Sequence, residues 1–329
     1  MKKYFFILLF LSFLLTNCNN GKSPVINVAH GNSGDIIVVM SDERWNGEAG
    51  DALKLTFQKE IETLPMEEPL FDLHQIQYDN FNNTANNRHR NIIYLDFNPN
   101  VDSSNIKIIK NKFALNQIFV LVTAKNQNDF IRMITEHQKQ LTKLFLDSDR
   151  NRYIQQIKQY NNPAIEKELK NKFNISMTFP KKFTIAVAKK DFYWISFETK
   201  KYTENIIVYS YPLTDSVKLD STFLIAQRNK FLQKYIPGEY EGSFMTTENK
   251  YEHPDLKIIK HNNLETAVMQ GLWRVHGDFM GGPFVSYTKI DKFRNTVVCV
   301  EGFVYYPNHS TRDIMRELEF IIYTFDFVF

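Results

Sequence analysis

The first feature in the pattern of hydrophobic and polar positions along the chain is an apolar run near residue 1. Residues 4–15 (YFFILLFLSFLL) are apolar except for Ser12, and they follow Lys2 and Lys3. A short positive start followed by such a run is typical of a secretory signal peptide, whereas a membrane-spanning helix needs about 20 apolar residues. The pattern predicts a signal peptide over residues 1–17.

The residues that end this run, Leu15-Thr16-Asn17-Cys18, resemble a bacterial lipobox, in which the cysteine is acylated and becomes the first mature residue. We therefore expect a lipid anchor at Cys18, membrane attachment through it, and a flexible tether over residues 18–29. Residues 19–23 contain no acidic side chain, which favours a periplasm-facing location at the inner or outer membrane. Ordinary signal cleavage nearby, leaving a soluble periplasmic protein, is the alternative.

Residues 30–173 are expected to form an N-terminal α/β subdomain that ends in a helical block. β-Branched runs that predict strands occupy residues 35–40, 70–78, 91–97 and 117–123, with a helix at 51–63 after the first of them. Residues 127–173 show an almost continuous helical period, and Asn162-Pro163 marks the start of its last helix.

Residues 174–329 are richer in strands and are expected to form a C-terminal antiparallel α+β subdomain. Predicted strands occupy residues 183–188, 192–198, 206–211, 264–275, 284–290 and 296–306, and predicted helices occupy 221–235 and 310–324. Ser310-Thr311-Arg312-Asp313 is a plausible capping box for the closing helix. The fold class is therefore α+β, with two strand-rich subdomains whose antiparallel or mixed sheets are covered by helices. For the second sheet we expect the helices on one face.

Composition and charge argue against some classes of function. The chain has 329 residues, a formal charge of +3 and only 12 glycines. Removal of residues 1–17 leaves 38 Lys and Arg against 37 Asp and Glu, so the mature domain is close to neutral. This charge does not suggest nucleic acid as a partner, and few glycines remain for phosphate-binding loops. We expect no cofactor. Cys299 lies in a strand pattern and is expected to be a buried thiol.

Several segments carry a family resemblance. They are Trp45-Asn46-Gly47, Gly50-Asp51, Pro65 with residues 67–72, Arg90-Asn91-Ile92, residues 277–284 (GDFMGGPF) and residues 301–307 (EGFVYYP). Together they resemble the lipoprotein family of Bacteroidota catalogued as domain of unknown function 4837, over nearly the whole mature chain. The resemblance implies that the chain is a lipoprotein, and it supplies no catalytic residues. The order of elements in the second half is similar, by analogy of fold, to PsbP-like and Mog1-like sandwiches.

The loop after the first predicted strand is the first candidate binding surface. Trp45 beside Asn46 offers one wall of a pocket, although a lid packed over the sheet edge is the simpler explanation of this tryptophan. The order strand, Gly47 to Gly50, helix is also that of a phosphate-binding loop. Glu48 and Asp51 would occupy the positive helix end themselves, which argues against a bound nucleotide.

The preferred candidate site surrounds the turn after the predicted strand 264–275. Its members are Trp273, His276, Asp278, Gly281 and Gly282. Two glycines and a proline impose an unusual backbone path, which often shapes a binding loop. A tight connection in which Asp278 caps its own turn is the structural alternative. Glu301 is expected either to face this loop or to point to solvent.

Asp72 and His74 lie two apart on a predicted strand and therefore on one face. They are weak candidates for a metal site or a general base, and a surface-facing pair is the simpler explanation. The chain contains no GxSxG, HExxH, CxxC or SxxK motif. We assign no catalytic residue and no metal ligand set.

These observations favour a non-catalytic binding or interaction module that faces the periplasm and binds an envelope protein or a small ligand through the Trp45 and His276 loops. The alternative is a carboxylate- and His-dependent periplasmic hydrolase in which Asp72, His74, His276 and Asp278 converge. A structural envelope factor without a pocket is a third possibility.

Overall fold

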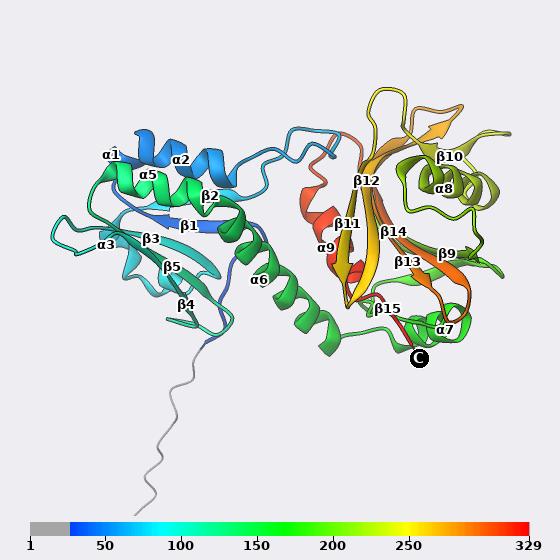
Figure 1. Ribbon diagram of the computed structural model, residues 1–329, viewed down its shortest axis with the longest axis horizontal. Coiled ribbons are helices and arrows are strands. Elements are labelled where there is room, and N and C mark those ends of the chain that lie inside the picture. Colours follow the sequence, from blue (N-terminus) through cyan, green and yellow to red (C-terminus); the bar gives the residue numbers. More distant parts are fainter. Residues whose placement is uncertain (1–26, 329) are drawn as a thin grey trace, which may run out of the picture.

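A computed structural model describes residues 27–328, and it contains two sheets that lie side by side along the long axis of the molecule (Figure 1). The predicted signal peptide and the predicted anchor at Cys18 lie outside the described residues. A 22-residue helix, α6 (Gln138–Gln159), runs from the first sheet toward the second. Within residues 27–328, no helix is long and apolar enough to cross a membrane.

The first sheet is mixed. Its strands are β1 (Asp35–Val39), β2 (Asp72–Ile76), β3 (Asn91–Phe97), β4 (Asn105–Lys110) and β5 (Ile118–Ala124), in the order β2-β1-β3-β5-β4. All neighbours are parallel except β4, which runs antiparallel to β5. Parallel strands are covered on both faces, which explains the continuous apolar runs of β1 and β5.

Helices cover both faces of this sheet. They are α1 (Asp42–Trp45), α2 (Glu48–Phe57), α3 (Tyr78–Phe81), α4 (Thr84–Asn87), α5 (Gln127–Glu136) and the first half of α6. Residues of α2, α5 and α6, including Leu53, Phe130 and Phe145, form one core with alternate residues of the strands. Phe81 of α3 packs in a smaller core on the opposite face.

The second sheet has eight strands and is antiparallel. They are β7 (Thr184–Ala188), β8 (Phe192–Glu198), β9 (Thr203–Pro212), β10 (Phe244–Thr247), β11 (Asp255–His261), β12 (Leu264–His276), β13 (Gly281–Asp291) and β14 (Thr296–Tyr305). The order is β10-β12-β13-β14-β9-β8-β7, and β11 also pairs with β12. The antiparallel α+β second half is therefore confirmed.

Three helices cover the second sheet: α7 (Pro163–Phe173), α8 (Ser221–Tyr235) and α9 (Arg312–Ile322). Buried residues of α7 and α9 pack on one face, and buried residues of α8 pack on the other. The expectation of helices on one face was therefore wrong. Because both faces are covered, β14 reads as an almost continuous apolar run rather than as an alternating one.

The chain end joins this second half. β15 (Asp326–Phe327) pairs antiparallel with β6 (Ile175–Ser176), and Phe325 and Phe327 are buried in the core beneath α7 and α9. The predicted subdomain boundary at residue 173 stays a prediction. The buried face of α7, however, packs with the second sheet and not with the first.

The structure differs from the local expectations in one helix, three strands and one helix cap. The helix predicted at 51–63 is α2, which begins at Glu48 and ends at Phe57. The strands β4, β10 and β11 were missed, since two of them, NIKIIK and DLKIIKH, mix lysines with isoleucines at a sheet edge. Finally, no side chain of the predicted capping box caps α9, whose first turn is bound by Glu68 instead.

Cys299 is a buried free thiol in β14, as expected. Burial raises the pKa of the Cys299 thiol to about 12. The thiol therefore stays protonated at neutral pH and is a poor nucleophile.

Candidate functional site

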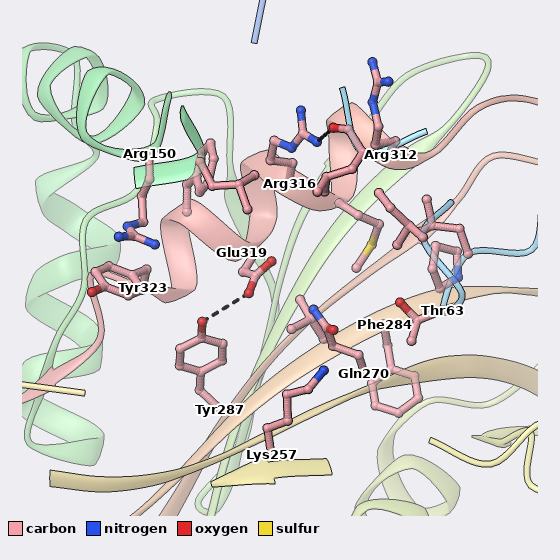
Figure 2. Close-up of a pocket in the computed structure, with 18 residues that line it drawn as sticks. Thr63, Arg150, Lys257, Gln270, Phe284, Tyr287, Arg312, Arg316, Glu319 and Tyr323 are labelled. Carbon is pink, nitrogen blue, oxygen red and sulfur yellow. Dashed lines mark hydrogen bonds between the residues drawn. The ribbon is translucent and has the colours of Figure 1, made fainter. Parts of the chain in front are cut away.

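A cleft with a volume of about 420 Å³ lies where the first half of the chain meets the second sheet (Figure 2). One wall is α9, and the opposite wall is formed by β11, β12 and β13. The segment between α2 and β2 and the middle of α6 complete it. The cleft is thus built from four parts of the chain that are distant in sequence.

Most of the surface inside the cleft is apolar. Its apolar lining comes from Leu64 and Leu70 of the α2–β2 segment, from Phe284 and Val285 of β13, and from Phe320 of α9. Phe284 and Val285 are almost fully buried, so their backbone positions are held by the sheet. Ligand sites typically combine such an apolar lining with a few convergent polar groups.

The polar groups of the cleft centre on Glu319. The hydroxyl of Tyr287 donates a hydrogen bond of 3.2 Å to the Glu319 carboxylate across the cleft, from β13 to α9 (Figure 2). Burial raises the pKa of Glu319, and it also raises the pKa of Tyr287 well above its usual value. Gln270 and Thr63 add uncharged polar side chains to the same cavity. The interior therefore offers both donors and acceptors.

Two cationic side chains stand at the wall opposite the α2–β2 segment. Arg150 of α6 lies over the Tyr323 ring, with its guanidinium carbon 3.8 Å from the ring centroid, and its Nε has no hydrogen-bond partner among the described residues. Lys257 of β11 is paired with Asp255 and remains well exposed. Arg150 also pairs with Asp147, so the charge of each of these cations is offset by a neighbouring carboxylate, and both side chains supply N–H donors at the rim of the cleft.

Arg312 and Arg316 line the cleft with their stems, and their guanidinium groups point away from Glu319 and Tyr287 (Figure 2). Arg312 donates to the Asp72 carboxylate at 2.6 Å and to the Pro69 carbonyl at 2.9 Å. Arg316 donates to the Leu70 carbonyl. Both arginines therefore hold the α2–β2 segment against α9 and fix the width of the cleft.

The pairing of Asp72 with Arg312 also shifts the pKa values of both side chains. The hydrogen bond from Arg312 lowers the pKa of the Asp72 carboxyl. Burial works to lower the pKa of Arg312, but its hydrogen bonds to Asp72 and Asp313 outweigh burial and raise that pKa. Asp72 is thus a structural anion at the junction of the two halves.

Glu68 completes the junction. Its carboxylate accepts the backbone N–H groups of Thr311 and Arg312 at 2.7 and 2.9 Å, and it also accepts the hydroxyl of Ser310. These are donors that a helix start leaves without an intrahelical partner, and a carboxylate there also favours the helix dipole. A residue of the first half, and not a side chain of the predicted capping box, therefore caps α9.

The structure places Trp45 and Asn46 at the end of α1, and neither of them lines the cleft. Trp45 packs partly buried against the core of α2, and Lys54 lies 4.8 Å from its ring centroid. Asn46 ends the helix. This arrangement matches the lid that covers the sheet edge.

The residues around the β12–β13 turn serve the sheet. Trp273 is 4% exposed, and its indole N–H donates to the Val304 carbonyl at 3.2 Å. Gly281 and Gly282 are strand residues paired with Arg274 and Trp273. A Cβ on Gly282 would lie 2.3 Å from the Val304 carbonyl oxygen, so this glycine permits close packing of backbone and indole.

The turn itself contains His276 and Asp278. The exposed His276 ring stacks on Phe244 at 5.0 Å, and Asp278 accepts the backbone N–H of Phe279 at 2.6 Å. The Phe279 side chain is fully exposed. Neither His276 nor Asp278 lines the cleft.

Glu301 neither faces this turn nor points to solvent. It is fully buried on the α8 side of β14, where it accepts two hydrogen bonds from Arg228 of α8, at 2.7 and 2.8 Å. The expectation of a loop-facing or solvent-facing carboxylate was wrong, because α8 covers a face that the sequence pattern left open.

Asp72 and His74 do not act together. Asp72 binds Arg312, whereas His74 lies 3.3 Å from Asp35 on the neighbouring strand β1. Among residues 27–328, no group of three or more His, Cys, Asp or Glu side chains is placed to hold a metal ion.

The sequence reasoning missed the cleft residues. A usable signal was present in α9, where Arg312, Arg316 and Glu319 recur at helical spacing beside the apolar stripe of Leu318, Ile321 and Ile322. Charged residues that border a buried stripe mark a helix which contacts a second surface rather than solvent.

Comparison with known families divides the chain at the end of α6. Residues 162–324 match the family described as Domain of unknown function (DUF4837), and residues 29–158 match Domain of unknown function (DUF8532). The second half of the chain belongs to the DUF4837 family. The resemblance expected over nearly the whole mature chain therefore holds for the DUF4837 region only, and the segments around Trp45, Pro65 and Arg90 lie outside it. A search of the curated proteins finds no match.

Solved structures show distant likeness. A protein of Bacteroides thetaiotaomicron is 12% identical, with 47% of this chain and 45% of that chain covered and a TM-score of 0.26, so this chain spans about half of its length. The Ran-binding protein Mog1p of Saccharomyces cerevisiae is 12% identical (47% and 90% covered, TM-score 0.27). LpqN of Mycobacterium tuberculosis, described as involved in cell envelope biogenesis, is 10% identical (45% and 79% covered, TM-score 0.27). No function is transferred from these similarities.

Proposed function

We propose that this chain is a non-catalytic binding protein of the cell envelope, held at a membrane by a lipid on Cys18 and facing the periplasm. Its cleft between α9 and the β11–β13 wall takes a small molecule that has an apolar body and a polar group. The lipobox-like sequence at Cys18 supports the proposed attachment to a membrane. The chemistry of the cleft supports the binding role.

The observation that carries this proposal is the convergence of Tyr287, Glu319 and Gln270 on an otherwise apolar cavity of about 420 Å³. The apolar lining favours burial of a hydrocarbon or aromatic body. The polar groups fix its orientation through directional hydrogen bonds. The N–H donors of Arg150 and Lys257, each of which also pairs with a carboxylate, favour ligands whose polar group accepts hydrogen bonds.

The alternative of a carboxylate- and His-dependent hydrolase has less support. Acid–base catalysis requires its groups within hydrogen-bond reach of one substrate. Asp72 pairs with Arg312 of α9 and His74 pairs with Asp35 of β1, whereas His276 and Asp278 stand at a turn of the second half. None of the four lines the cleft.

A blocked cleft tests the binding role. Thr63 lines the cavity from a loop, so Thr63→Trp should fill it while leaving both cores intact. The matched control is Glu62→Trp, which puts the same side chain on the exposed neighbouring position outside the cleft. The probe is 1-anilinonaphthalene-8-sulfonate, which combines an apolar body with an anionic group. Wild type and Glu62→Trp should bind it with one saturable site, and Thr63→Trp should lose that site.

Equal dye binding by all three proteins, each shown to be folded by circular dichroism, would exclude the cleft as the binding site. A saturable signal lost only in Thr63→Trp would support it. Native mass spectrometry of the wild-type protein after incubation with an envelope lipid extract would then identify which molecule is retained.

The anchor is tested separately. Cys18→Ser should abolish incorporation of labelled palmitate and shift the protein from the membrane fraction to the periplasmic fraction. Cys299→Ser is the matched control, because that thiol is buried and lies in a strand. Palmitate labelling that persists in Cys18→Ser would contradict the proposed anchor without bearing on the cleft.

A further inference from the structure

A second cavity, of about 600 Å³, lies on the other side of α9 from the cleft. Its walls are the loop before β1, the start of β3, the second half of α6, the segment before β7, and the side of α9 that carries Asp313 and Glu317. We call it the Arg90 cavity, after one of the cations that line it. It shares no lining residue with the cleft.

Cations gather in the Arg90 cavity from three parts of the chain. Arg90 comes from the residue before β3, Arg152 from α6, and Lys181 and Lys182 from the segment before β7. Lys182 donates to Glu204 at 2.6 Å and is therefore neutralised. Lys181 is exposed and stands at the opening.

The carboxylates in the same cavity are already engaged. Asp149 is fully buried; it accepts from the Gly34 backbone N–H at 2.9 Å and also binds Arg152. Asp313 accepts from Arg312 at 2.8 Å. Glu317 accepts from the Tyr153 hydroxyl at 3.3 Å, and burial raises its pKa, which disfavours its negative charge.

Arg90 is left without a close partner. Its side chain is only 21% exposed, and its nearest contact to a carboxylate is 3.8 Å, from Nη1 to Asp149. A guanidinium that is removed from water in this way needs an anion or hydrogen-bond acceptors to offset desolvation.

Three buried donors around this cavity have no hydrogen-bond partner among residues 27–328: Ser33 Oγ, Arg90 Nε and Arg152 Nε. The side chain of Arg152 is nine-tenths buried, and its Nη1 and Nη2 already donate to Asn116, Ser148, Asn91 and Asp149, so that only its Nε is unpaired. Native proteins rarely leave buried donors unpaired, and three around one cavity point to an acceptor-rich occupant. A tetrahedral oxyanion presents several acceptors at once and suits the planar guanidinium.

We propose that the Arg90 cavity binds a phosphate or sulfate group, with Arg90, Arg152 and Ser33 as donors and Lys181 at the opening. Free phosphate and a phospholipid headgroup share this chemistry. The headgroup is a source to test because Gly31, at the edge of the cavity, follows the proposed lipid anchor Cys18 by 13 residues. An extended tether of that length spans at most about 45 Å, so the cavity would stay near the membrane surface.

Calorimetric titration of the full chain with inorganic phosphate, and separately with sulfate, tests the site. Sodium chloride at matched ionic strength measures general screening. We expect one phosphate site on the wild-type protein and a Kd at least about tenfold weaker for Arg90→Gln, since a charge-assisted pair is lost. Arg88→Gln is the matched control, because Arg88 lies two residues away and outside the cavity. Its Kd should be unchanged.

A second variant covers the case in which Arg90→Gln fails to fold. Lys181→Gln alters an exposed side chain and should weaken phosphate binding severalfold, whereas Lys190→Gln, also exposed, should not. Sedimentation with phosphatidylglycerol vesicles and with phosphatidylcholine vesicles distinguishes the sources. Binding to the former only, lost in Lys181→Gln, identifies a headgroup.

The proposal is overturned if neither phosphate, sulfate nor phosphatidylglycerol binds more tightly than chloride, which would mean that the cavity holds water only. It is also overturned if the Lys181 and Lys190 variants bind alike. Because Thr63 lies in the other cavity, a failure here leaves the proposal for the cleft untouched, and the reverse also holds.

Discussion

The Glu68 carboxylate accepts the backbone N–H of Arg312 at 2.9 Å, so a residue of the first half caps the helix that lines both cavities. Glu68 is 4% exposed and accepts four donors from residues 310–312. The two family regions of the chain therefore meet in a satisfied hydrogen-bond cluster rather than in a loose apolar contact.

Removal of this cap should destabilise the protein. Glu68→Ala leaves the first N–H groups of α9 without an acceptor, and we expect a loss of about 1–3 kcal/mol in the free energy of unfolding. Urea denaturation measures it. Glu67→Ala, at the exposed neighbouring position, should change the free energy by less than about 0.5 kcal/mol. Equal stability of the two variants would contradict the role of Glu68 in capping α9.

The buried pair of Arg228 and Glu301 predicts strong coupling. Both side chains are fully buried and joined by two hydrogen bonds. Glu301→Leu or Arg228→Met alone leaves one buried charge without its partner and should cost about 3–5 kcal/mol. The double variant Arg228→Met, Glu301→Leu should cost much less than the sum of the two single changes. A double-mutant cycle by urea denaturation checks this, and additive losses would show that the pair is not coupled.

Acid stability should depend on Asp72. Its pKa is lowered in the folded protein by the hydrogen bond from Arg312, so the folded state binds fewer protons there than the unfolded state. This contribution to stability is complete above the ordinary pKa of about 4 and is lost as the pH falls through the lowered value. Asp72→Asn should flatten the fall in stability below about pH 4, measured by urea denaturation across pH. Asp79→Asn, on the exposed helix α3, should leave the curve unchanged.

Gly282 should not tolerate a side chain. An added Cβ would lie 2.3 Å from the Val304 carbonyl oxygen and 3.0 Å from the Trp273 indole nitrogen. Gly282→Ala therefore forces the strand or the indole to move, and we expect a loss of about 1–3 kcal/mol. Gly47→Ala is the control, because its nearest contact would be 3.4 Å. Thermal unfolding compares them, and equal melting temperatures would show that β13 and Trp273 adjust without cost.

The strand and helix pattern of the second half could be predicted well because its signals are local. The helix predicted at 221–235 is α8 residue for residue, and Asn162 with Pro163 begins α7 as expected. Asn162 accepts the Ile165 N–H, which is the short-range contact that makes such a start readable.

The cleft, in contrast, could not be predicted, since its geometry depends on contacts between segments far apart in the chain. Glu68 binds residues more than 240 positions later, and no local pattern encodes that distance. The surroundings of Glu301 could not be predicted for the same reason. A lone carboxylate in an apolar strand suggests an open sheet face until the arginine that covers it is known, and Arg228 comes from a helix 73 residues earlier.

Helix α6 is shared by both cores. Leu141 and Phe145 are buried with the first sheet, whereas Ile157 is buried with the second. An α-helix turns by about 100° and rises about 1.5 Å per residue. A single-residue insertion or deletion between Phe145 and Ile157 would therefore rotate one half around the other and misalign both cavities at once. The number of residues in α6 between these positions therefore sets how the two halves align.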